Sequence, residues 1–160
     1  MNLGITVVGV HARSVLLNLG GEVVARAEST QADTTDAVVA AVRETLASAQ
    51  GVVPDAVGLS FPDPDPGSWP TDLTFLAAAV GEQIPIKTVS LGNAAALAEM
   101  WYGPGHGVRD LIAFSIGSSV SAGVISNGTL LAGAHGAASS VAWLALNPVD
   151  RDDYRRLGCL

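Results

Sequence analysis

Val89-Ser-Leu-Gly-Asn-Ala-Ala-Ala-Leu-Ala-Glu99 is the stretch that decides the fold of this chain. The apolar run 84–89 that leads into it has the length and composition of a buried strand. The alanine-rich part predicts a helix over 93–101, because alanine favours helix and its small side chain allows close packing on a sheet. Asn93 is expected to cap this helix. A strand that runs directly into a helix is typical of α/β proteins.

The residues before this stretch predict the same class. Runs rich in β-branched residues predict three strands joined by tight turns at the amino terminus. Apolar residues that recur every four positions predict a helix after these strands. Asp33 or Thr34 is expected to cap its start, and Gly51 marks its end. Thr71 is expected to cap a second, shorter helix. The predicted strands span 3–10, 14–19, 22–27 and 56–61, and the predicted helices span 34–50 and 72–80.

The segment 111–134 repeats the plan of the first hairpins. Gly9 and Gly117 are separated by the same number of residues as Gly20 and Gly128. Matched hairpins with helical material between them indicate a duplicated unit. The predicted order is therefore β-β-β-α-β-α-β-α followed by a second β-β-β meander, with a mixed sheet flanked by helices. The strands of the second meander are predicted over 111–116, 122–125 and 129–132.

The composition excludes several classes of protein. The 160-residue chain has a net charge of −7 and only 8 lysines and arginines, so it lacks the basic surface of a nucleic-acid-binding protein. No uncharged apolar run reaches the roughly 18 residues of a membrane-spanning helix, and we expect a cytoplasmic protein without membrane contact. Cys159 is the single cysteine, which excludes an intramolecular disulfide and a cysteine-cluster metal site.

Two stretches carry a resemblance to a known family. Asn127-Gly-Thr-Leu-Leu-Ala-Gly-Ala-His-Gly-Ala-Ala138 and the helix start at 93–99 resemble the ROK family of bacterial sugar kinases and sugar-responsive repressors. The resemblance implies the actin-like ATPase (ribonuclease H-like) α/β fold. It also implies that residues 1–108 form the amino-terminal lobe and that 109–160 form the truncated start of a second lobe. In this register we expect no DNA-binding module within the chain.

The resemblance also shows where the family's catalytic base is missing. ROK kinases place a catalytic aspartate two residues before the asparagine of this helix start, and here Leu91 occupies that position. A general base must be a titratable group, and an aliphatic side chain cannot accept a proton. We therefore expect no catalytic residue at this position. Asp63 and Asp65, in a nearby proline-rich loop, remain open as substitutes for the base.

Both hairpin loops depart from the family's phosphate-binding pattern. Thr6-Val-Val-Gly-Val10 keeps only Gly9 and has Thr6 where the family has an acidic metal partner. The stretch 116–123 resembles the family's second glycine-rich turn, in which Gly117 and the hydroxyl of Ser118 are kept. Gly9, Gly117 and Ser118 are therefore vestigial phosphate-binding candidates, since turns of this kind direct backbone N–H groups at anions. A plain structural turn is the alternative for each loop.

The positions that hold the sugar and the zinc in the family have also changed. Ser140 and Trp143 stand where the resemblance places a sugar-binding glutamate and histidine. Together with Asn93 and His135 they are weak sugar-binding candidates. The alternatives are that Trp143 fills core space and that His135 packs at the lobe boundary. The family's zinc site uses that histidine and three cysteines, so we expect no metal and no cofactor here.

Three functions remain open from the sequence. The loss of the family's catalytic, sugar-binding and zinc-binding residues favours a catalytically inactive ROK-type domain. Such a domain would be the effector and dimerisation part of a sugar-responsive transcriptional regulator, and this chain would make no direct contact with nucleic acid. Its expected partners are a carbohydrate effector and a second copy of the chain, which would associate through the apolar segment 111–134. The alternatives are an ATP-dependent, glucokinase-like hexose kinase and a pseudokinase scaffold that binds a protein partner.

Overall fold

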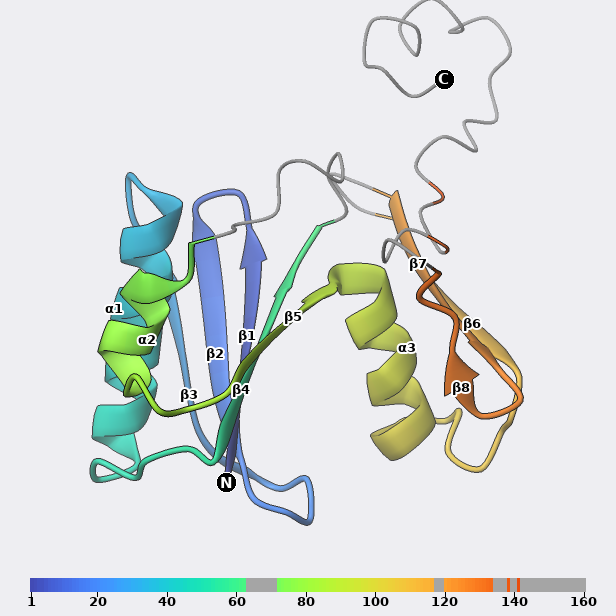
Figure 1. The fold of residues 1–160 in the computed structure, drawn as a ribbon, viewed down its shortest axis with the longest axis horizontal. Coiled ribbons are helices and arrows are strands. Elements are labelled where there is room, and N and C mark those ends of the chain that lie inside the picture. Colours follow the sequence, from blue (N-terminus) through green and yellow to red (C-terminus); the bar gives the residue numbers. More distant parts are fainter. Residues whose placement is uncertain (63–71, 117–119, 134–137, 139–140, 142–160) are drawn as a thin grey trace, which may run out of the picture.

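The computed structural model of the chain describes residues 1–62, 72–116, 120–133, 138 and 141. Within these residues the elements follow one another as β-β-β-α-β-α-β-α-β-β-β (Figure 1), and this order confirms the order predicted from the sequence. The strands form two separate sheets, with one long helix between them.

The first sheet contains five strands in the order β3-β2-β1-β4-β5. The antiparallel part is formed by β1, β2 and β3, and the parallel part by β1, β4 and β5. The sheet is therefore mixed, as predicted, and the carboxyl ends of its parallel strands meet at one edge. The strands are β1 (Asn2–Val8), β2 (His11–Leu17), β3 (Val23–Thr30), β4 (Ala56–Phe61) and β5 (Ile86–Ser90).

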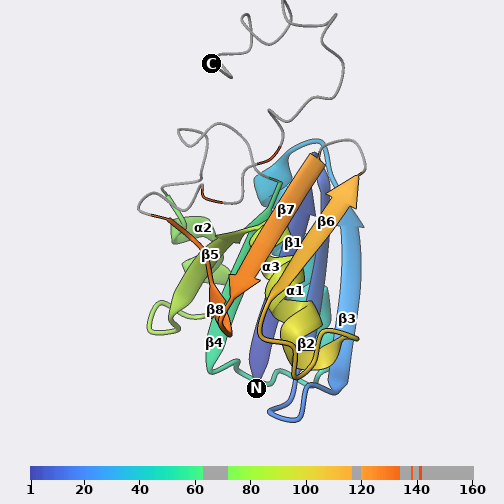
Figure 2. The ribbon, with the colours of Figure 1, turned by 90° about the vertical axis from the view of Figure 1, so that its right-hand side faces the viewer.

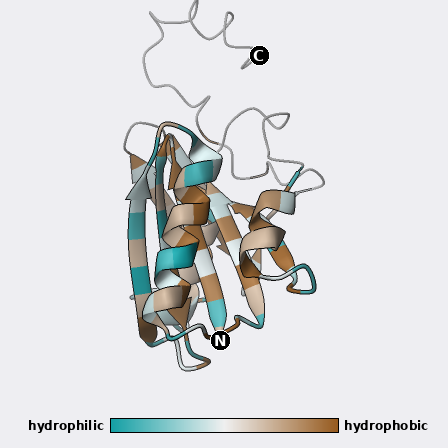
Figure 3. Ribbon diagram, turned by 90° about the vertical axis from the view of Figure 1, so that its left-hand side faces the viewer, coloured by the Kyte–Doolittle hydropathy of each residue, from teal (hydrophilic) through white to brown (hydrophobic). Residues whose placement is uncertain are grey.

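Helix α1 (Thr34–Ser48) covers one face of the first sheet and closes the core. Asp33, one of the two caps that the sequence predicted, caps it by accepting hydrogen bonds from the backbone N–H groups of Thr35 and Asp36. Figure 3 shows the helices of this side in front of the sheet. Alternate residues of the strands point toward α1 and are buried, which is the pattern of a sheet covered on one face. The largest buried core side chains are Leu3, Leu16, Leu59, Leu76, Val38, Val42 and Val57.

Two helix starts differ from the prediction. Helix α2 (Thr74–Val80) begins later than expected and has Leu73 at its N-cap, so Thr71 is not the cap; the backbone N–H of Thr74 donates instead to Asp72 Oδ1 at 2.9 Å. Helix α3 (Leu91–Tyr102) begins two residues before Asn93, and Ser90 is its cap. Asn93 is the donor in this arrangement, through its backbone N–H to Ser90 Oγ at 3.3 Å.

The second sheet packs on α3. It consists of β6 (Leu111–Ile116), β7 (Val120–Ser126) and β8 (Thr129–Leu130), all antiparallel, and its last strand is shorter than predicted. Figure 2 shows α3 behind these strands. At the crossing of α3 and β7 the backbones of Gly92 and Gly123 touch. A Cβ atom on Gly123 would lie 2.1 Å from Gly92 O, so neither position has room for a side chain.

The carboxyl end of α3 returns to the first sheet. The ring of Tyr102 packs against Gly21 in the β2–β3 turn, where a Cβ atom would lie 2.2 Å from Tyr102 Cε1. Gly21 has a φ of 80°, a left-handed conformation that glycine adopts without strain. Helix α3 is therefore held by the first sheet at both ends. No helix among the described residues is long and apolar enough to cross a membrane.

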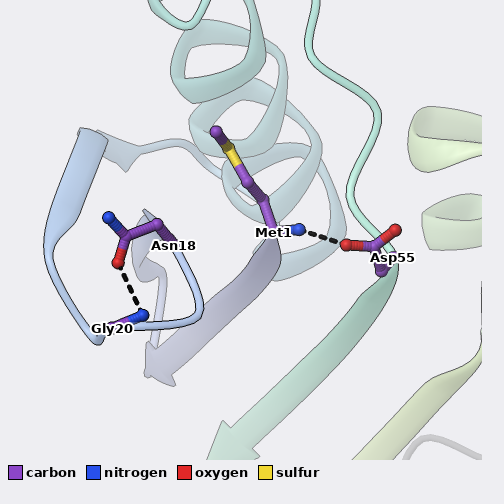
Figure 4. A network of polar contacts seen from close by, with 4 residues as sticks. All are labelled: Met1, Asn18, Gly20 and Asp55. Carbon is purple, nitrogen blue, oxygen red and sulfur yellow. Dashed lines mark hydrogen bonds and ion pairs between the residues drawn. The ribbon is translucent and has the colours of Figure 1, made fainter.

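Polar contacts fasten the end of the first sheet at which β1 and β4 begin and the β2–β3 turn lies, as Figure 4 shows. The amino-terminal ammonium of Met1 forms an ion pair with Asp55, just before β4. In the β2–β3 turn, Asn18 Oδ1 accepts the backbone N–H of Gly20 at 2.9 Å. Asparagine is favoured in turns because its side chain can bond to the backbone two residues on.

The carboxylate of Asp110 braces the turn between β7 and β8, and we expect this brace to be lost in acid. Hydrogen bonds from Asn127 N–H and Ser126 Oγ hold the pKa of Asp110 below its ordinary value of 3.8. Because the pKa of Asp110 is lower in the folded state, its carboxylate stabilises the fold fully above pH 3.8. This stabilisation is lost as the pH falls through the lower pKa of the folded state. In an NMR titration the Asn127 amide should report a pKa below 3.8, and Asp110→Asn should abolish that step. A titration at or above the ordinary value would contradict the brace.

Candidate functional site

The edge at which the parallel strands end is where an α/β sheet places its ligand site. Strand register brings the last residues of β1, β4 and β5 together there: Thr6 is level with Ser60, and Phe61 is level with Ser90. Leu91 follows directly as the first residue of α3, and Gly9 follows β1. Two positions singled out from the sequence, Gly9 and Leu91, therefore lie at one edge of the first sheet.

Thr6 has a local hydrogen-bond role at this edge. Its Oγ1 lies 3.0 Å from Ser60 Oγ, and Ser60 Oγ donates to the backbone carbonyl of Ile5 at 3.2 Å. Since Ser60 uses its only proton on Ile5, Thr6 donates to Ser60. The hydroxyl pair thus joins β1 to β4, where the resemblance places a carboxylate. Neither hydroxyl supplies the negative charge that a divalent cation requires.

Leu91 brings no titratable group to the edge, as its residue type predicted. It is half-buried, and the preceding Ser90 is occupied as the helix cap. Asp33 is at the same edge, but its carboxylate accepts two backbone N–H groups at the start of α1. Asp63 and Asp65, the substitutes considered above, lie outside the described residues. The described part of the edge therefore offers no carboxylate at the end of β1, β4 or β5.

Gly9 keeps the conformation of a tight hairpin turn. Its φ is 61°, and no atom lies within 4 Å of where a Cβ would be. Thr34 Oγ1 donates to the carbonyl of Gly9 at 3.0 Å and ties the turn to the start of α1. The turn is open to solvent, but the partly exposed side chains of Val8 and Val10 flank it. A glycine with free space beside two apolar side chains suits a structural turn better than a phosphate cradle.

The remaining predicted site residues divide into buried and undescribed ones. Asn93 is only 3% exposed, in the first turn of α3 beside the Gly92–Gly123 contact. Gly123, which the resemblance places in the second glycine-rich turn, lies inside strand β7 and serves helix packing. The other candidates lie outside the described residues: Gly117, Ser118, His135, Ser140 and Trp143.

A polar hollow that the sequence reasoning missed lies on the face of the first sheet opposite α1. It has a volume of about 410 Å³. Arg13 Nε lies 3.2 Å from Glu28 Oε1, and His11 Nδ1 lies 2.8 Å from Thr30 Oγ1 across neighbouring strands. The alternation of His11 and Arg13 on β2 could have revealed a polar face. The size suits a small ligand, and its lining is Thr6, Val8, His11, Ala12, Arg13, Glu28, Ser29 and Thr30.

Comparisons with known sequences find relatives of two kinds. A family model described as "ROK family" matches residues 76–152. The glucokinase of Halalkalibacterium halodurans is 32% identical over 66 residues, which cover 41% of this chain and 20% of the relative. The xylose repressor of Caldicellulosiruptor bescii is 36% identical over 80 residues, which cover 48% of this chain and 20% of the relative. The alignments thus span about a fifth of each curated relative.

A solved structure shares the fold over most of this chain. The ROK hexokinase from Thermus thermophilus superposes with a TM-score of 0.74 at 23% identity, over 92% of this chain and 53% of that one. The architecture is the actin-like ATPase fold of ROK sugar kinases, as the resemblance implied. The chain spans about half the length of that hexokinase. The family match over residues 76–152, the two curated relatives and the shared fold together show that this chain is similar to proteins of the ROK family.

Proposed function

We propose that this chain is a sugar-responsive ROK domain without kinase chemistry, and that it acts in the cytoplasm as the effector part of a transcriptional regulator. The observation that carries the proposal is the carboxyl edge of the first sheet. Leu91 stands there at the position of the catalytic base, and the hydroxyl of Thr6 is committed to Ser60. The repressor among the curated relatives supports a regulatory role. We assign 1–108 to the first lobe and 109–160 to the start of the second.

The chemistry of phosphoryl transfer explains why these two positions matter together. Transfer of a γ-phosphoryl group requires a bound metal ion, in-line positioning and a group that takes the proton of the attacking hydroxyl. A leucine cannot take that proton, and a neutral threonine hydroxyl neutralises no metal charge. Each substitution removes a different requirement, so restoring one of them alone would leave the reaction without the other.

We expect no hexose-dependent turnover of ATP by this chain. The assay would follow ADP release with ATP–Mg²⁺ and a panel of hexoses and N-acetylhexosamines. The glucokinase of Halalkalibacterium halodurans serves as the positive control in the same buffer. The expected rate equals that of the buffer blank for every sugar, and Leu91→Asp is expected not to raise it. Turnover above the blank would overturn the proposal in favour of a kinase.

Calorimetric titration of the same protein separates a sensor from a scaffold. Heat with one of the sugars and none with ATP–Mg²⁺ is the expected result for an effector domain. Absence of heat with every sugar would reject the sensor and favour the pseudokinase scaffold that binds a protein partner. The polar hollow offers a direct control, because Arg13→Ala should leave the titration unchanged if the sugar binds elsewhere.

A hexose kinase is the second candidate, and it is favoured by the names of the relatives. Two of the curated relatives are glucokinases and one is a β-glucoside kinase. This candidate requires a carboxylate from outside the described residues, such as Asp63 or Asp65, to replace the base. Loss of turnover in both Asp63→Asn and Asp65→Asn variants of an active preparation would assign the base to that loop.

A further inference from the structure

A groove runs along the face of the first sheet opposite α1, and the polar hollow described above is one end of it. A second hollow of about 300 Å³ adjoins the first, since Thr6, Arg13 and Glu28 line both of them. The second hollow is also lined by Gly4 and Arg26. We call the two hollows together the sheet groove. Figure 1 shows α1 and α2 on the other side of this sheet.

The middle of this sheet face has no side chains to fill it. Gly4 on β1 lines the sheet groove and is level with Gly58 on β4. A Cβ atom on Gly58 would have no atom within 4 Å, so the space beside the groove is open. A glycine inside a strand often marks a place where a ligand or another backbone approaches closely. The sheet groove is therefore a depression that hydrogen-bonded strands hold in shape.

The sheet groove has a neutral end and a cationic end. Strand register sets Arg13 opposite Glu28, and the two side chains form an ion pair, so their charges cancel. Arg26 lies two residues before Glu28 on β3 and therefore faces the same side of the sheet. Among the described residues, no carboxylate lies within ion-pair distance of Arg26. The groove thus has one unpaired positive charge, in a chain whose net charge is −7.

One unpaired guanidinium favours a ligand with one negative charge. The N–H groups of an arginine form a planar fork that binds a carboxylate through two parallel hydrogen bonds. A phosphate group with two negative charges would leave one of them unpaired near Glu28, in a chain whose own charge repels anions. The cationic end of the sheet groove is therefore better matched to a carboxylate than to a phosphate.

The neutral end of the sheet groove suits hydroxyl groups. Arg13 can donate hydrogen bonds there and Glu28 can accept them. Thr6 Oγ1 gives its proton to Ser60, so it also presents an acceptor to a ligand. A hydroxyl group both donates and accepts, and a ligand with several of them can use all three side chains. The two volumes, about 410 and 300 Å³, give room for a small ligand that reaches both ends.

We propose that the sheet groove binds a sugar acid, a polyhydroxylated ligand with one carboxylate. The carboxylate pairs with Arg26, and the hydroxyl groups bond to Arg13, Glu28 and Thr6. The proposal is independent of the proposed function, because the groove holds this ligand whether or not a neutral sugar binds elsewhere on the domain.

An NMR titration of the full chain with glucuronate tests the site. Backbone amides of β2 and β3 that line the groove should shift and saturate in the millimolar range. Glucose, which lacks the carboxylate, and acetate, which lacks the hydroxyl groups, should each bind about tenfold more weakly. Arg26→Gln should weaken glucuronate binding by about tenfold, because it removes the charged partner of the carboxylate. Arg43→Gln is the matched control, since Arg43 is exposed on α1, on the other side of the sheet.

Four outcomes would overturn the site. Absence of saturable shifts with glucuronate would show that the groove binds no sugar acid. Equal affinity for glucuronate and acetate would leave an adventitious ion only. Unchanged affinity in Arg26→Gln would place the ligand elsewhere, and tighter binding of a sugar phosphate than of glucuronate would make the ligand a phosphate. The amide spectrum of each variant without ligand distinguishes loss of binding from loss of the fold, because unfolding collapses the dispersion of the whole spectrum.

Discussion

Replacement of Gly92 by alanine is expected to destabilise the chain by about 3 kcal/mol, at the upper end of the range for overpacked sites. The Cβ of the new side chain would lie 2.1 Å from Ala122 O and 2.3 Å from Ala122 C. These are backbone atoms of β7, which cannot rotate away as a flexible side chain could. Helix α3 would have to move away from the second sheet. The contact that joins the two halves of the structure would then be weakened.

Urea denaturation of Gly92→Ala measures this effect, and Gly58→Ala is its control. Gly58 lies in the middle of β4, has no atom within 4 Å of a Cβ position and does not have a positive φ. Alanine there is expected to change stability by less than about 1 kcal/mol. Gly123→Ala should repeat the Gly92 result, since the two glycines touch each other. Equal midpoints for Gly92→Ala and Gly58→Ala would show that the helix and the sheet are not packed backbone to backbone.

Replacement of Leu59 by alanine is expected to cost about 3 kcal/mol of unfolding free energy, for a different reason. Leu59 is 1% exposed on β4, which lies between β1 and β5, and its neighbours in the ladder are Ile5 and Thr88. Truncation removes apolar contacts and leaves a cavity that flanking strands cannot close, because their positions are fixed by hydrogen bonds on both sides.

The matched control for this prediction is Leu19→Ala. Leu19 is 87% exposed in the β2–β3 turn, so the same chemical change there should alter stability by less than about 0.5 kcal/mol. Thermal and urea unfolding of the two variants should differ accordingly. A loss below about 1 kcal/mol at Leu59 would mean that the core refills around the missing side chain.

Much of the fold could be predicted from the sequence because its signals are local. Runs of β-branched and apolar residues predicted the strands, and a four-residue apolar period, capping residues and an alanine-rich stretch predicted the helices, in the order that the described residues show; β4 has the predicted bounds. The N-cap of a helix was harder to predict, since several residues near a helix start can act as the cap. Asn93 was expected to cap α3, but Ser90 does so because the chain turns into helix two residues earlier. The close contact of Gly92 with Gly123 joins segments whose packing no local pattern records.

The site was predictable only in its residue types. The absence of a carboxylate at position 91 is visible in the sequence, and the structure puts Leu91 at the edge where the parallel strands end. The hydrogen bond between Thr6 and Ser60 joins residues 54 positions apart, so it depends on strand register that the sequence does not display. The polar hollow was missed for the same reason, because its lining comes from three strands whose pairing had to be known first.

The contact between Tyr102 and Gly21 limits how the two halves of the molecule can move. Helix α3 is joined covalently to β5 at one end and rests on the β2–β3 turn at the other, while its flank carries the second sheet. A rod fixed at both ends can only turn about its own length. Any motion that preserves both contacts is therefore a roll of the second sheet around the axis of α3. A hinge-like separation of the halves would first have to lift the tyrosine ring from its glycine.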